Sequence, residues 1–90
     1  MAQLVSITLQ DTNDGRMIAD AIRQDNPGVE TLSMPGALKL DRAGDLVIRA
    51  STVSEKLGRE WDPQEIHMTM ISMAGNLDED DDYFALSWNR

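Results

Sequence analysis

Few side chains in this chain are suited to catalysis or metal binding. The chain has no cysteine and a single histidine, His67, so thiol catalysis, disulfides and thiolate-ligated metals are excluded. A dinuclear-iron helix needs a glutamate three residues before a histidine, but Gln64 holds that position. Because no serine, cysteine or aspartate lies at an informative spacing from His67, we expect it to be a surface side chain of a strand, on the face opposite Ile66 and Met68.

A run of five acidic residues is the second candidate, because carboxylates bind calcium. An EF-hand loop needs spaced ligands, a glycine at its sixth position and a terminal glutamate, and here Tyr83 holds the glycine position. No glycine-rich phosphate loop occurs either. We therefore expect no catalytic residue, no metal site and no cofactor in this chain. The run remains a candidate for electrostatic steering toward a basic partner, or else a solvated face: Asp78, Glu79, Asp80, Asp81 and Asp82.

Charge is distributed unevenly along the chain. Residues 1–59 include eight acidic and seven basic residues, whereas residues 60–90 include eight acidic residues and one base, Arg90, in a chain of net charge −8. Nucleic-acid phosphates and anionic lipids repel such a protein, so we expect neither as a partner. No basic residue precedes Arg16 and no long apolar run occurs, which favours a cytoplasmic protein without a signal peptide or membrane span.

Hydrophobic periodicity predicts a strand, a helix and two more strands in the first half. Apolar and polar residues alternate over 5–9, the pattern of a half-buried strand. A helix follows, with N-cap candidates at 12–14, an apolar face at 17, 18, 21 and 22, and a stop at Asn26-Pro27-Gly28. Residues 29–34 and 38–40 have strand patterns, joined by a Pro35-Gly36 turn.

The same order of elements recurs in the second half. We expect a turn at 41–44, a strand over 46–50, and a short helix that begins at the capping-box pair Thr52 and Glu55 and ends at Gly58. Asp62 and Pro63 favour one further helical turn. Residues 66–72 and 83–88 alternate again, and we expect them to form a hairpin whose long connection has a function.

These patterns predict one α+β domain over residues 1–90. It consists of two β-α-β-β repeats, roughly residues 3–41 and 45–88, with antiparallel sheets and helices packed on one side. We expect Met68 and Met70 to fill the core. Met73 lies beyond the alternating run and is the better candidate for an adaptable binding surface, because methionine repacks easily.

The chain contains an ordered set of short motifs: Asn26-Pro27-Gly28, Leu57-Gly58-Arg59 with Trp61, Gln64-Glu65, and Ser72-Met73-Ala74-Gly75-Asn76 before the acidic run. This set resembles the effector family of bacterial multicomponent monooxygenases, most of all the regulatory components of phenol hydroxylases. The resemblance covers almost the whole chain and implies the same two-repeat fold. It implies a non-catalytic, cofactorless protein that binds an oligomeric dinuclear-iron hydroxylase, which a separate reductase carrying FAD and an iron–sulfur cluster supplies with electrons from NADH.

The resemblance also implies a hydroxylase-binding segment. In the methane monooxygenase effector, the matching segment is a run of small polar residues that lies toward the entrance to the iron site. This chain is more apolar there, with Ile71 and Met73, and flexible methionine suits a wider route for an aromatic substrate. The alternative is that Ile71 and Met73 only complete the core. The candidate segment is Ile71, Ser72, Met73, Ala74, Gly75 and Asn76.

Two functions of other classes stay open. The acidic C-terminal third also suits an inhibitor or nucleic-acid mimic that occupies a basic groove on its target. A small-ligand sensor is the other, although no polar pocket signature supports it. An effector raises the turnover and coupling of a hydroxylase, whereas a mimic only blocks its target.

Overall fold

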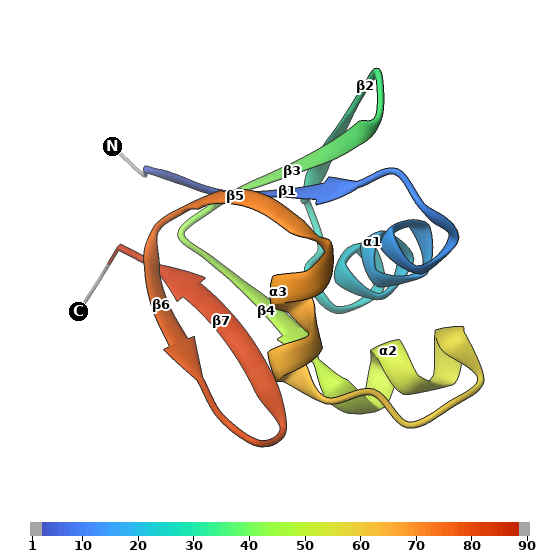
Figure 1. The fold of residues 1–90 in the computed structure, drawn as a ribbon. Helices are drawn as coiled ribbons and strands as arrows, with labels where there is room; N and C mark the ends of the chain where they lie inside the picture. The colour runs from blue at the N-terminus through green and yellow to red at the C-terminus, as the bar shows by residue number, and fades with distance from the viewer. Residues whose placement is uncertain (1–2, 89–90) are drawn as a thin grey trace.

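The computed structural model describes residues 3–88, which form an α+β fold (Figure 1). The first half contains β1 (Leu4–Gln10), α1 (Asn13–Asp25), β2 (Glu30–Met34) and β3 (Ala37–Ala43). The second half contains β4 (Asp45–Arg49), α2 (Ala50–Leu57), the 3-10 turn η1 (Pro63–Glu65), α3 (Ile66–Thr69), β5 (Met70–Ala74), β6 (Asn76–Glu79) and β7 (Tyr83–Ser87).

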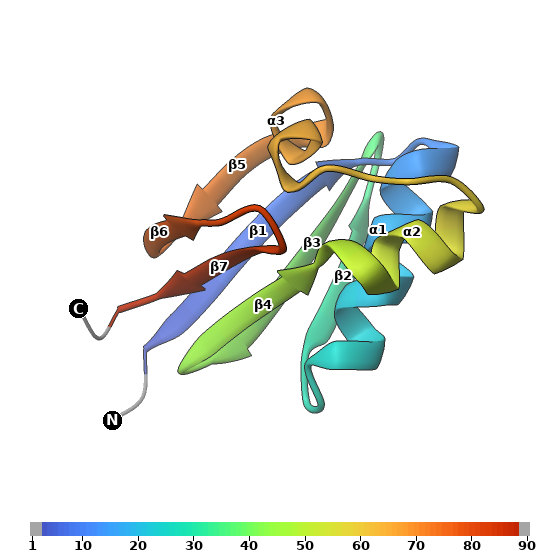
Figure 2. The ribbon, with the colours of Figure 1, turned by 90° about the horizontal axis from the view of Figure 1, so that it is seen from below.

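All strand pairs are antiparallel and they build two sheets. The four-stranded sheet has the order β2-β3-β1-β5, and the three-stranded sheet has the order β4-β7-β6. In the first half, the last strand, β3, lies between β1 and β2. In the second half, the last strand, β7, lies in the same way between β4 and β6. This shared order confirms the predicted α+β fold of two repeats, with β6 and β7 as the last two strands of the second repeat and β5 as an additional strand of the first sheet. Helices α1 and α2 pack against each other and lie on one side of the sheets (Figure 2).

The predicted hairpin of residues 66–72 and 83–88 is wrong. Residues 66–69 are α3, and β5 pairs with β1 in the four-stranded sheet. The partner of β7 is β6, which lies in the stretch expected to be a loop. Two acidic residues in β6 hid this strand from the sequence pattern. An edge strand tolerates them, because charge there discourages pairing with another chain.

The four-residue alternation that suggested a strand at 66–69 is also compatible with a helical turn. Asp62 caps η1, accepting from the Gln64 N–H at 2.9 Å, and α3 continues from this turn. Ile66 is buried but Met68 is 78% exposed, so the expectation that Met68 fills the core is wrong. Met70 is half-buried and packs against the core.

In the second half, the residues that cap the helices differ in part from the predicted ones. Helix α2 begins at Ala50 rather than at Thr52, which is buried, and its N-cap Arg49 makes no side-chain capping bond. The strand predicted over 46–50 therefore ends one residue early, and the turn predicted at 41–44 is confined to residue 44. A capping box is formed instead by Asp62 and Glu65. The predicted helical turn at Asp62-Pro63 and the end of α2 at Gly58 are confirmed.

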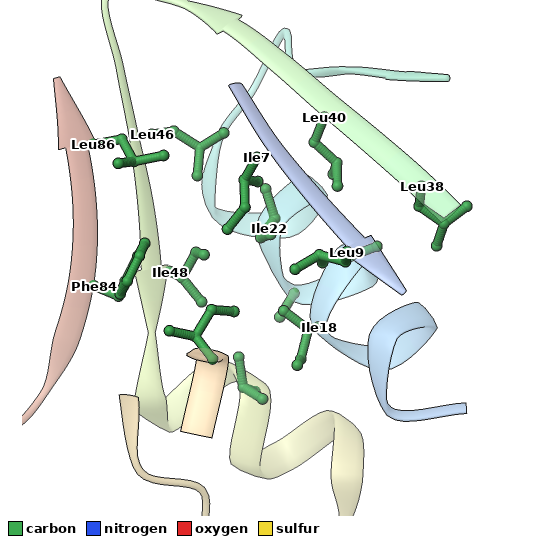
Figure 3. Close-up of a cluster of buried hydrophobic side chains, with 14 of the residues drawn as sticks. Ile7, Leu9, Ile18, Ile22, Leu38, Leu40, Leu46, Ile48, Phe84 and Leu86 are labelled. Carbon is green, nitrogen blue, oxygen red and sulfur yellow. The ribbon is translucent and has the colours of Figure 1, made fainter. Parts of the chain in front are cut away.

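The core lies between the two sheets and helix α1 (Figure 3). Ile18 and Ile22 of α1 point toward Ile7 and Leu9 of β1, as the predicted alternation and helical face require. Both halves contribute to this single cluster, which includes Val5, Leu40, Leu46, Ile48, Val53, Trp61, Ile66, Phe84 and Leu86. The two halves of the chain therefore share one hydrophobic core.

The chain passes from one sheet to the other at two glycines. Gly44 joins β3 to β4 with φ +94°, and Gly75 joins β5 to β6 with φ +139°. Both values lie in the region that glycine adopts without strain and that other residues rarely occupy. These corners let a strand of one sheet continue directly into the other.

Gly15 lies where α1 starts against the end of β1. A Cβ at this position would lie 1.9 Å from the backbone oxygen of Gln10. We expect Gly15→Ala to lower the free energy of unfolding by at least about 2 kcal/mol, because a packing clash of about 3 kcal/mol exceeds the gain of about 1 kcal/mol in helix propensity. Urea unfolding, with Gln24→Ala on the same helix as the control, measures this. An unchanged midpoint would show that α1 shifts freely away from β1.

Candidate docking interface

Residues 71–76 form a continuous exposed stretch, here called the docking ribbon, that runs along β5 and through Gly75 into β6. Ile71 and Met73 are 55% and 39% exposed. Ser72, Ala74 and Asn76 are also exposed, and Gly75 is half-buried. The alternative that Ile71 and Met73 only complete the core is therefore wrong.

A β-bulge turns Ile71 outward. Thr8 of β1 pairs with Ser72, but the next residue, Leu9, pairs with Met70. Ile71 is thus an extra residue with no partner in β1. A bulge bends its strand and redirects a side chain, which explains why a large apolar residue is exposed within a strand.

Met73 and Leu77 extend the core surface to an open edge. Met73 pairs with Ile7, and Leu77 pairs with Leu86. Paired residues of antiparallel strands point to the same face, so both side chains lie on the core side of their sheets. β5 and β6 are the outermost strands of these sheets, and both side chains remain 39% exposed. The result is an apolar surface, continuous with the core, that a partner can cover.

The sequence analysis missed Leu77, which lies in the stretch expected to be a loop. The period-two spacing of Met73, Gly75 and Leu77 was the available signal. Gly75 shares this core-facing side, because a Cβ there would lie 3.2 Å from Val5 Cγ1 and 3.4 Å from Leu86 Cβ. Gly75 therefore allows the ribbon to cross close to the core.

The acidic run lies at the β6 end of the ribbon. Asp78 and Glu79 belong to β6, and residues 80–82 form the turn to β7. Asp78 accepts a hydrogen bond from the Tyr83 hydroxyl at 3.1 Å, and Glu79 contacts His67. The other three acidic side chains make no ion pair with any residue between 3 and 88: Asp80, Asp81 and Asp82.

Most of the basic side chains, by contrast, are paired with carboxylates outside residues 78–82. Arg16 donates to Asp11 at 2.7 Å, and this hydrogen bond, with the charge of Asp11, raises the pKa of the guanidinium. Other pairs join Arg23 with Asp20, Lys39 with Asp41, Arg42 with Asp45, and Arg59 with Asp14 and Glu65. Among residues 3–88, Asp80, Asp81 and Asp82 are the one run of consecutive carboxylates without an ion pair, and this run follows the far end of β6.

His67 is a surface residue as expected, but on α3 rather than on a strand. Its ring contacts Glu79 and forms a T-shaped pair with the ring of Phe84, with 6.0 Å between the ring centroids. Across residues 3–88, no three histidine or carboxylate side chains are grouped to hold a metal ion. Over the same residues, no helix has the length and apolar character to cross a membrane.

Comparison with known proteins gives matches over nearly the whole chain. The chain is 43% identical over 88 residues to the stimulatory component DmpM of phenol 2-monooxygenase from Pseudomonas sp. (strain CF600), which covers 98% of both proteins. Chains of two solved structures of a phenol hydroxylase–regulatory protein complex superpose with TM-scores of 0.92 and 0.88, at 48% and 44% identity. These superpositions cover 97% and 96% of this chain and 100% of the matched chains.

A more distant structure shares the fold. The regulatory protein B of soluble methane monooxygenase superposes with a TM-score of 0.76 at 17% identity, over 96% of this chain and 65% of that protein. The MmoB/DmpM family model matches residues 3–87. By its sequence and its fold, the chain belongs to the MmoB/DmpM family.

Proposed function

We propose that this chain is the regulatory component of a multicomponent phenol monooxygenase and that it binds and stimulates the hydroxylase without catalysing a reaction itself. This proposal rests on the similarity of this chain to a chain of a phenol hydroxylase–regulatory protein complex, at 48% identity and over 97% of its length. It acts as a single cytoplasmic domain without a cofactor. Its partner is an oligomeric dinuclear-iron hydroxylase, and a reductase with FAD and an iron–sulfur cluster acts on the same hydroxylase.

Such a protein acts through differential binding. It changes the hydroxylase only by binding one conformation of it more tightly than another. To shift a minor conformation from about 1% to about 99% takes about 5.5 kcal/mol of differential affinity. That requirement is met by a broad contact surface rather than by a single residue.

The docking ribbon and its surroundings have the properties of such a surface. Ile71, Met73 and Leu77 provide exposed apolar area, and the carboxylates of residues 80–82, which make no ion pair within residues 3–88, follow at the far end of β6. Interfaces commonly combine an apolar centre with a polar rim, and charge at the rim steers association. The complementary surface of the hydroxylase is therefore apolar with basic residues at its edge. An apolar cover also limits the access of water to a reaction site.

The acidic-inhibitor alternative predicts the opposite activity. Reconstituted turnover with purified hydroxylase and reductase separates the two functions, because an effector raises product formation and its coupling to NADH consumption. The named activity of the DmpM relative is stimulation, which supports the effector. Inhibition at every ratio of this chain to hydroxylase would overturn the proposal.

Replacing Met73 with alanine tests the docking ribbon. We expect turnover or coupling to change several-fold, while the free energy of unfolding falls by less than about 1.5 kcal/mol, because an exposed methionine buries less area than a core methionine, whose loss costs about 2–5 kcal/mol. Leu32→Ala is the matched control, since Leu32 is an exposed apolar residue on the far edge strand of the same sheet. A large loss of stability with normal stimulation would contradict the docking role of Met73.

A further inference from the structure

The docking ribbon is attached to the fold along one side only. β5 pairs with β1 and β6 pairs with β7, and the other edge of each strand is open. Backbone segments with few partners open locally at low free energy. A segment that must present a defined surface to a partner therefore needs attachment at its ends.

His67 and Glu79 lie just before and just after this segment. His67 is on α3, which leads directly into β5, and Glu79 is the last residue of β6. Their side chains are in contact, which connects two positions 12 residues apart and closes a loop around the ribbon. The rings of His67 and Phe84, a core residue, are also in T-shaped contact.

The side chain of Glu79 points to the core side of its sheet, unlike that of its neighbour Asp78. Glu79 pairs with Phe84, which is buried, whereas its neighbour Asp78 pairs with Ala85 on the outer face of the sheet. From residue 60 to residue 89 the chain contains no lysine or arginine. His67 is therefore the one basic residue of that stretch, and it contacts Glu79.

We infer that His67 and Glu79 form a clasp that holds the docking ribbon in its binding conformation, and that both are positioning residues for association with the hydroxylase. This inference rests on the proposed function. A segment held in its bound conformation loses less conformational freedom on binding, which increases affinity. Loss of the His67–Glu79 contact raises the concentration of this protein that is needed for half-maximal stimulation of the hydroxylase. It leaves the maximal stimulation at saturation unchanged.

A titration of hydroxylase activity with the intact protein tests the clasp. His67→Ala and Glu79→Ala are each expected to raise the half-saturating concentration about three- to tenfold, the size of one lost hydrogen bond. The double variant is expected to show no further increase, because the two residues act as one unit. Glu79→Gln keeps a hydrogen-bonding oxygen and is expected to retain most of the affinity. Glu55→Gln on α2 removes an equal charge away from the ribbon and is the matched control.

Hydrogen exchange supplies a readout that does not depend on the hydroxylase. His67→Ala is expected to increase amide exchange over residues 70–79 and to leave exchange in α1 and β3 unchanged. Additive effects of the two single variants on half-saturation, or unchanged exchange in the ribbon, would overturn the clasp. If the unaltered chain does not stimulate any hydroxylase, the proposed function fails, and the exchange measurement still decides whether the clasp exists.

Discussion

Replacing Asn26 with alanine is expected to lower the free energy of unfolding by about 3–5 kcal/mol, because three hydrogen bonds are lost at a buried site and both backbone groups of Val47 are left without a partner, at about 1–3 kcal/mol each. Asn26 is 1% exposed. Its side-chain amide donates to the carbonyl oxygens of Ile22 at 2.8 Å and Val47 at 2.7 Å, and its Oδ1 accepts from the Val47 N–H at 2.9 Å. One side chain thus ends α1 and pairs with the open edge of β4.

Chemical denaturation of two asparagine variants separates this role from a general effect of the substitution. Asn26→Asp keeps the acceptor for Val47 but cannot donate to either carbonyl when ionised, so we expect a loss comparable to that of Asn26→Ala. Asn13→Ala, at the exposed start of α1, is expected to change stability by less than about 1 kcal/mol. Since small domains are stable by only about 5–15 kcal/mol, a loss at Asn26 below about 1 kcal/mol would show that the pairing with β4 contributes little.

Neutralising the acidic turn between β6 and β7 is expected to slow association with the hydroxylase about tenfold at low salt. The double variant Asp81→Asn with Asp82→Asn removes two carboxylates whose side chains make no ion pair within residues 3–88. Charge at the rim of an interface acts mainly on the association rate, and salt screens it. Stopped-flow association over a range of salt concentrations measures both the rate and its salt dependence.

A charge-matched control distinguishes local steering from net charge. The double variant Glu30→Gln with Glu55→Gln changes the net charge equally at exposed positions on β2 and α2. We expect its association rate to change much less than that of the Asp81/Asp82 variant. Equal rates for the two variants at low salt would mean that the acidic turn is a solvated surface without a steering role.

Local patterns in the sequence predicted much of the framework. The alternation through Val5, Ile7 and Leu9 gave β1, and the Asn26-Pro27-Gly28 stop gave the end of α1. The order of elements gave the two repeats, and the ordered motifs gave the family. Each of these features depends on residues close in the chain, where periodicity, capping and turn propensity act. The exposed position of Ile71 and Met73 remained one of two alternatives.

The tertiary structure decided which strands pair and which apolar residues stay exposed. Residues 66–69 are helical because a capped turn leads into them, and β5 joins β1, which lies about 60 residues earlier in the chain. Alternation shows that one face of a strand is apolar, but it does not show whether another strand covers its edge. Met73 is exposed for this reason, whereas Met68 is exposed because it lies on α3 rather than on a strand. The contact of Asn26 with Val47 has the same origin, because pairing across distant segments depends on the whole packed arrangement and not on the local sequence.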